Sequence, residues 1–131
     1  MSNRKNFNSA TVPRMNTFIP QAVINDNLIF LSGMAALDPA TGKLISDDFE
    51  EQTRQCFLNI QTILEEAGSN LSNILKTTIF MVAGNDFGTI NKVYGEFFPN
   101  NPPARSVPQV LPFPGGILIS VECIAVRNAE I

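Results

Sequence analysis

The stretch DDFEEQTRQCFLNIQTILEEAGSNLSNILKTTIFM, residues 47–81, predicts a helix, a turn and a strand. Asp48 is a favourable N-cap residue, and Glu51 stands three residues later, as in a capping box. Apolar residues then recur at helical spacing, namely Cys56, Phe57, Ile60, Ile63, Leu64 and Ala67. Gly68 can end the helix as its C′ residue. The β-rich run of residues 76–82 then predicts a strand.

Toward the N-terminus the pattern predicts strands. Residues 18–24 are mostly apolar and predict a strand with Pro20 at a sheet edge. A turn at residues 25–27 leads into a buried strand at 28–32, which Gly33 closes. A second turn at 38–42 precedes a short strand at 43–45. The polar residues 1–17 are the segment least committed to structure, so we expect one domain over residues 18–131.

Toward the C-terminus the pattern predicts a second helix and a last strand. Asn85 or Asp86 can cap this helix, and one stripe carries Phe87, Ile90, Tyr94 and Phe97. Pro99 ends the helix, and residues 117–126 predict a long strand. The resulting class is α+β, a mixed sheet with both helices on one face. Self-association is the simplest way to cover the other face.

Composition excludes several classes of protein. The 131 residues are 44% hydrophobic and 16% charged, which is sufficient for one folded domain. This low charge fits a surface buried between copies of the chain, and it equally fits a monomer with a generous core. The net charge of −3 makes nucleic acid an unlikely partner, since no basic footprint is present. No run approaches the ~20 apolar residues of a membrane span.

The chain contains no histidine, which removes the most common general base and metal ligand. A Ser-His-Asp triad and a His-ligated zinc site are therefore excluded. Cys56 and Cys123 lie inside apolar periodic segments and predict buried thiols rather than a disulfide. These free thiols favour a reducing, cytoplasmic location.

Five segments together resemble the RidA (YjgF/UK114) family, in that family's order and spacing. They are LSGMAALDPATGKL at residues 31–44, the opening stretch at 47–81, NDFGTINKVYGEFF at 85–98, NPPARSVPQV at 101–110 and VECIAV at 121–126. The resemblance runs from about residue 18 to residue 127.

The resemblance implies a chorismate-mutase-like fold and a homotrimer with ligand clefts between its subunits. It also implies hydrolysis of reactive imines, such as 2-aminoacrylate and 2-iminobutanoate, to 2-keto acids and ammonia. Active members need no metal or organic cofactor, so none is expected here. The label endoribonuclease is also attached to this family. The acidic composition and the missing histidines make it the least expected activity.

Arg105 is the strongest site candidate, because it matches the arginine of the family's Pro-Ala-Arg-Ser motif, which binds the substrate carboxylate. A guanidinium fork matches a carboxylate bidentately, although an arginine in a surface loop is the ordinary alternative. The resemblance also assigns Ser32 and Gly33 to the cleft wall. Asn91 matches a residue of the second helix. A loop that includes Gly116 and Ile117 is expected to contact ligand through its backbone.

Three positions depart from the family pattern. Ile19 stands where active members have a cleft-facing tyrosine, Val107 stands where many carry a cysteine, and Ser120 replaces a glutamate that holds the hydrolytic water. Glu122 shares a strand face with Ser120, about 7 Å along the chain, and could accept a proton from a water held by Ser120. Alternatively, Glu122 is structural. The chain is therefore either an imine hydrolase or a weakened trimer that binds small carboxylates or protein partners.

Overall fold

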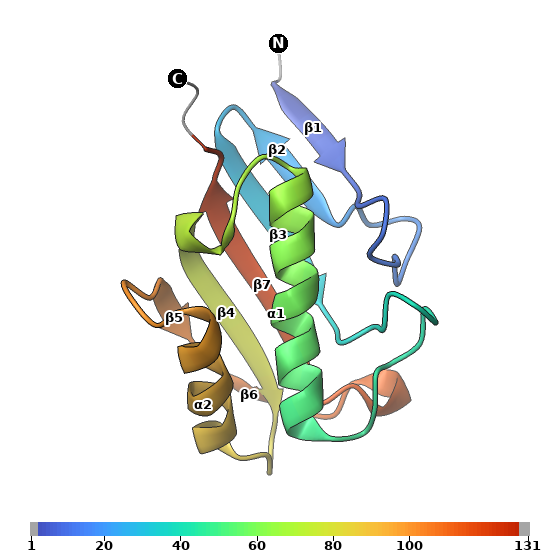
Figure 1. Cartoon of the computed structure of the whole chain (residues 1–131). Coiled ribbons are helices and arrows are strands. Elements are labelled where there is room, and N and C mark those ends of the chain that lie inside the picture. Colours follow the sequence, from blue (N-terminus) through green and yellow to red (C-terminus); the bar gives the residue numbers. More distant parts are fainter. Residues whose placement is uncertain (1–2, 129–131) are drawn as a thin grey trace.

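Seven strands form one mixed sheet in the order β1-β2-β3-β7-β4-β5, with β6 beside β4 (Figure 1). This computed structural model describes residues 3–128. The strands are β1 Arg4–Phe7, β2 Ala22–Asn25, β3 Leu28–Met34, β4 Ile74–Val82, β5 Ala104–Ser106, β6 Gln109–Val110 and β7 Ile119–Val126. The short strands β5 and β6 run parallel to β4, and the other pairings are antiparallel.

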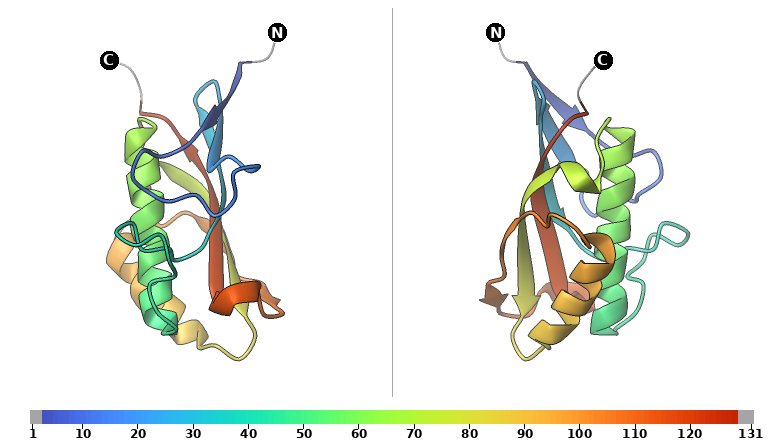
Figure 2. Two further views of the ribbon diagram at one scale, coloured as in Figure 1. Left: turned by 90° about the vertical axis from the view of Figure 1, so that its right-hand side faces the viewer. Right: turned by 60° about the vertical axis from the view of Figure 1, so that its left-hand side comes forward.

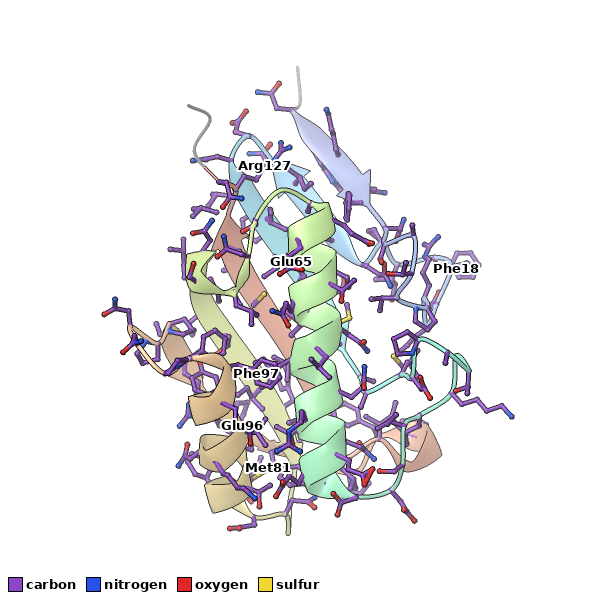
Figure 3. The ribbon with its side chains drawn as sticks, viewed as in Figure 1. Phe18, Glu65, Met81, Glu96, Phe97 and Arg127 are labelled. Atoms are coloured by element: carbon purple, nitrogen blue, oxygen red, sulfur yellow. The ribbon has the colours of Figure 1, made fainter. Side chains whose placement is uncertain are left out.

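Two α-helices, α1 (Phe49–Glu66) and α2 (Phe87–Phe97), pack on one face of this sheet (Figure 2). Phe57 of α1 contacts Phe97 of α2 with ring centroids 5.5 Å apart, and Phe97 lies between the two helices (Figure 3). At the surface, Arg54 Nη2 lies 2.7 Å from Glu96 Oε2 and joins the same helices. The predicted class, α+β with both helices on one face, is confirmed.

The ends of α1 follow the local sequence signals. The Asp48 carboxylate accepts a hydrogen bond from the Glu51 N–H at 2.9 Å, as expected of an N-cap. Gly68 has a φ of +84°, which glycine adopts without steric cost. The Ser69 N–H reaches the Leu64 carbonyl at 2.8 Å, so the helix ends in a Schellman motif.

The N-terminal third differs from the predicted strands. β2 begins only at Ala22, because Pro20 has no N–H to donate to a ladder and its carbonyl accepts the Ser32 hydroxyl instead. β1, at residues 4–7, pairs with β2 and was not predicted. Residues 43–45 form only an isolated bridge, between Leu44 and Leu37. The boundary of the domain at residue 18 stays a prediction.

In the part of the chain that the structure describes, the sheet face opposite α1 and α2 carries no helix (Figure 2). Strand alternation places half-buried or exposed side chains on it, including Phe30 of β3 and the β7 residues Ser120, Glu122 and Ile124. Phe30 is 42% exposed in the single chain. Within residues 3–128, no helix is long and apolar enough to cross a membrane.

Candidate functional site

Arg105 lies on strand β5 rather than in the surface loop that its proline-rich neighbourhood suggested. It stands opposite Thr77 in the parallel pairing with β4. Its Nη1 donates to the Asn91 Oδ1 at 2.9 Å. The guanidinium carbon lies 4.9 Å from the ring centre of Tyr94 and 5.5 Å from that of Phe87. Strand β5 therefore fixes the backbone end of this side chain, and residues of α2 fix its guanidinium end.

Tyr94 supports Arg105 from the core side. Its hydroxyl shares a 2.9 Å hydrogen bond with Thr77, and its ring packs 4.6 Å from Phe98. Burial raises the pKa of the Tyr94 phenol, an effect that the bond to Thr77 and the charge of Arg105 partly oppose. The phenol therefore stays neutral near pH 7 and acts as a platform rather than a base.

A cavity of about 360 Å³ opens between the N-terminal loop and the end of β3. Four of the predicted site residues line it: Ile19, Ser32, Gly33 and Glu122. Most of the remaining wall is apolar and comes from Val12, Pro13, Met15, Pro20, Met34, Ala35 and Leu37. Phe18, next to Ile19, projects from the same loop into solvent (Figure 3).

Ser32 ties this loop to the sheet. Its hydroxyl donates to the Pro20 carbonyl at 2.8 Å, and its N–H donates to the Gln21 carbonyl at 2.9 Å. The hydroxyl proton is therefore engaged, while the oxygen lone pairs can still accept a hydrogen bond. The buried Gln21 donates to the carbonyls of Val12 and Pro13 at 3.0 and 3.2 Å. Gln21, which sequence reasoning missed, holds the cavity wall.

A β-bulge brings Gly33 against Ser120. Leu31 pairs with Cys123 and Met34 pairs with Val121, so Ser32 and Gly33 together face the single residue Glu122. A Cβ added at Gly33 would lie only 2.6 Å from the Ser120 Oγ. Glycine at this position thus lets the Ser120 hydroxyl reach the backbone of the bulge. Four predicted residues, Ser32, Gly33, Ser120 and Glu122, meet here.

Gly116 and Ile117 belong to a different part of the molecule. Gly116 is the last residue of the turn η2 (Pro114–Gly116), and Ile117 directly follows it. The buried side chain of Gln52 holds this turn. The Gln52 Nε2 donates to the Gly116 carbonyl at 3.1 Å, and its Oε1 accepts from the Leu118 N–H at 2.9 Å. Neither Gly116 nor Ile117 lines the cavity. Their predicted ligand contact stays a prediction.

Apart from Gly116 and Ile117, the predicted residues form two groups that one chain does not bring together. Arg105 and Asn91 lie on β5 and α2, whereas Ser32 and Gly33 lie on β3. The sheet order places β7 and β4 between β3 and β5, a separation of about 14 Å at the usual spacing of strands. A small ligand held by Arg105 cannot reach Gly33 of the same chain across that distance.

Thiol chemistry is not available in these groups. The Cys56 thiol is fully buried and donates to the Met34 carbonyl at 3.2 Å, and burial raises its pKa. Burial also raises the pKa of the Cys123 thiol, to about 12, so neither forms a thiolate near pH 7. Over residues 3–128, no cluster of three or more His, Cys, Asp or Glu side chains could hold a metal ion.

The fold is that of a small α+β protein with both helices on one face of a mixed sheet and a half-buried arginine on its short strand β5. The chain belongs to the endoribonuclease L-PSP family, since the family's profile matches residues 10–127. This confirms the membership in the RidA group that the five sequence segments indicated.

Relatives with assigned names support the same grouping. The chain is 37% identical to the 2-iminobutanoate/2-iminopropanoate deaminase of Rattus norvegicus, over 95% of this chain and 91% of that protein. It is 44% identical to the chloroplastic Reactive Intermediate Deaminase A of Arabidopsis thaliana, over 80% of this chain and 56% of that protein.

Solved structures agree with the fold. RidA from the Antarctic bacterium Psychrobacter superposes with a TM-score of 0.87 at 30% identity, covering 93% of this chain and 98% of that one. Escherichia coli TdcF with bound serine superposes with a TM-score of 0.86 at 33% identity, covering 95% of this chain and 99% of that one.

Proposed function

We propose that this protein hydrolyses small reactive imino acids, of the 2-aminoacrylate and 2-iminobutanoate type, to 2-keto acids and ammonia. The observation that carries the proposal is the oriented guanidinium of Arg105, which offers in-plane donors to a carboxylate. The names of the rat and Arabidopsis relatives support this choice of substrate class.

The chemistry needs little from the protein. Arg105 holds the substrate carboxylate, and a water adds to the electrophilic carbon of the protonated imine. A C–O bond forms, the C–N bond then breaks, and ammonia leaves as the keto group forms. Ser120, whose hydroxyl lies beside Gly33 of the cavity wall, orients the water, and Glu122, which lines the cavity, accepts its proton. The chemistry requires no metal or organic cofactor.

The separation of the two residue groups supports a site shared between chains. Arg105 and Asn91 of one chain would face the cavity of a second chain, with its Ile19, Ser32 and Gly33. The sheet face without a helix offers the surface for such contact. We propose a homotrimer with three such sites, located in the cytoplasm.

A trimer that only binds carboxylates is the second candidate. Ile19 and Ser120 favour it, since each removes a polar group that active members carry. The serine in the TdcF structure is an amino acid with a carboxylate, consistent with either candidate. RNA cleavage fits least well, because the chain has a net charge of −3 and no histidine.

Replacing Arg105 tests the proposal. Arg105→Ala should abolish ammonia and keto-acid release and weaken 2-ketobutyrate binding by about 2–4 kcal/mol, the cost of losing a charged, bidentate partner. Arg127→Ala, at the opposite end of β7 from Ser120, serves as the matched control (Figure 3). Release of ammonia by the unmodified protein, measured spectroscopically, separates hydrolase from binder. Unchanged 2-ketobutyrate affinity in Arg105→Ala, by calorimetry, would mean that the anion site lies elsewhere.

Mixing two inactive variants tests the shared site. Arg105→Ala removes one half, and Ile19→Asp places a repelling carboxylate in the other half. Trimers assembled from equal amounts of both should recover about a quarter of the unmodified activity, the share of random interfaces with both halves intact. Native mass spectrometry verifies that mixed trimers form. Mixed trimers without activity would argue against a site built from two chains.

A further inference from the structure

We propose that Phe87 is a positioning residue for Arg105. Together with Tyr94 it forms an aromatic bracket, the two rings against which the guanidinium lies. The bracket holds Arg105 ready for a carboxylate, so this inference rests on the proposed function. Sequence reasoning gave Phe87 a place on the core stripe of α2 and no role in the site.

The contacts of Arg105 come from one face of α2. Phe87, Asn91 and Tyr94 are spaced by four and three residues, which aligns them along the helix. The guanidinium carbon lies within 6 Å of both ring centres, the range of attraction between a cation and an aromatic face. The Asn91 Oδ1 accepts one N–H beside the rings. The three side chains thus restrict both the tilt and the rotation of the guanidinium.

Phe87 contributes differently from Tyr94. The Tyr94 ring is buried, packs on Phe57 and Phe98, and is tied through its hydroxyl, so it would stay in place without Arg105. Phe87 is 43% exposed at the first position of α2. The Phe87 ring is not part of the buried core, and the Arg105 guanidinium lies over its face. An exposed ring at this position is explained by the cation that lies over it.

A guanidinium held in this way can still bind an anion. Stacking on a ring uses the flat face of the group, while its N–H bonds point outward in the plane. Asn91 takes one N–H of Nη1, which leaves an in-plane pair for a carboxylate. Because the bracket already orders this long side chain, ligand binding loses less conformational entropy. Removing the ring should therefore weaken carboxylate binding without altering the chemical step.

The test compares Phe87→Leu with Phe87→Tyr. Leucine keeps apolar volume but has no aromatic face, so 2-ketobutyrate affinity should fall about two- to fivefold, the measured range for exposed cation–π contacts. In the imine assay KM should rise while kcat stays close to that of the unmodified protein, since the carboxylate is held equally in the ground and transition states. Phe87→Tyr, which keeps an aromatic face, should leave the affinity and KM close to those of the unmodified protein. Leu58→Ala, an exposed apolar residue on α1, is the control and should change neither.

A second readout needs no ligand. In the NMR spectrum of the intact protein, the Arg105 Nε–H should show a ring-current shift that Phe87→Leu reduces and Phe87→Tyr retains. An unchanged shift together with unchanged affinity in Phe87→Leu would overturn the inference. A loss of affinity in Phe87→Tyr as large as that in Phe87→Leu would overturn it too. If the unmodified protein released no ammonia, imine hydrolysis would be contradicted, while the NMR result would still decide the role of Phe87.

Discussion

The contact between Ser120 and Gly33 determines how the chain could hold a hydrolytic water. The Ser120 hydroxyl occupies the space where any other residue at position 33 would have its Cβ. A hydroxyl can hydrogen-bond a water, but it cannot hold a charge as a carboxylate does. The proposed activity should therefore be weak and limited by this residue.

Ser120→Glu should raise turnover, because a positioned acid or base typically contributes 10²–10⁴-fold, roughly, to the rate. Gly33, which has no Cβ, is the residue that lies against the replaced side chain. Ser120→Ala should lower the remaining activity, and steady-state ammonia release measures both. If the unmodified protein is already fast and Ser120→Glu changes nothing, Glu122 alone is a sufficient base. In that case Glu122→Gln should remove most of the rate.

At the residue scale, short motifs indicate candidate site residues, whereas residues whose roles come from distant contacts carry no such motif. Arg105, Ser32 and Gly33 stand in local motifs that resemble those of the family, and their ligand contacts stay predictions. Gln21 carries no such pattern, because its role comes from carbonyls nine and eight residues away, in a loop with no regular structure. Phe87 could be placed on a helix stripe, but the periodicity does not reveal that a cation lies over its ring.

At the scale of elements, the helices and long strands follow from sequence, while the short strands do not. Caps and periodicity located α1 and α2, because those signals are local. The sequence pattern predicts no strand at β5, because prolines flank these three residues and their partner β4 lies some thirty residues earlier. An edge strand nevertheless tolerates neighbouring prolines. β1 likewise depends on pairing with β2 and has only four residues.

Gln52 links two elements and predicts a measurable stability change. Its amide bonds the Ser46 and Gly116 carbonyls and the Leu118 N–H, all from a fully buried position. Gln52→Met keeps the volume but leaves these backbone groups without partners, which should cost about 1–3 kcal/mol.

Urea unfolding measures the loss in free energy of unfolding that is expected for Gln52→Met. Gln61→Met, on the more exposed side of α1, is the matched control and should change the free energy of unfolding little. An equal loss in both variants would mean that methionine itself, rather than the broken hydrogen bonds, lowers stability. Loss confined to Gln52→Met would assign the ordering of residues 114–118 to this side chain.

At the scale of the whole molecule, sequence reasoning anticipated a sheet face without a helix, because two helices cannot cover both faces. It could not anticipate how the candidate residues divide between the β3 and β5 sides, since that depends on strand order. The order β3-β7-β4-β5 is set by long-range pairing. The proposed shared site predicts that assembly and function are coupled, so that disrupting the assembly should remove the activity.

Phe30 and Leu58 allow a matched test of this coupling, because both side chains are 42% exposed in the single chain but lie on opposite layers. Phe30 is on the bare sheet face, and Leu58 is on α1. We expect the unmodified protein to scatter light as a species of about three times the 14.3 kDa chain mass. Phe30→Asp should convert it to monomer, since assembly would bury an unpaired carboxylate.

Leu58→Asp should remain trimeric, because its carboxylate stays in water. Circular dichroism should show both variants folded, since neither replaced side chain belongs to the buried core. The Phe30→Asp monomer should also lose carboxylate affinity, although Arg105 and the cavity residues are unaltered, because the two halves of the site then no longer meet. Dissociation by Leu58→Asp alone would assign the contact to the helical layer. A Phe30→Asp monomer with full 2-ketobutyrate affinity would show that one chain binds the ligand unaided.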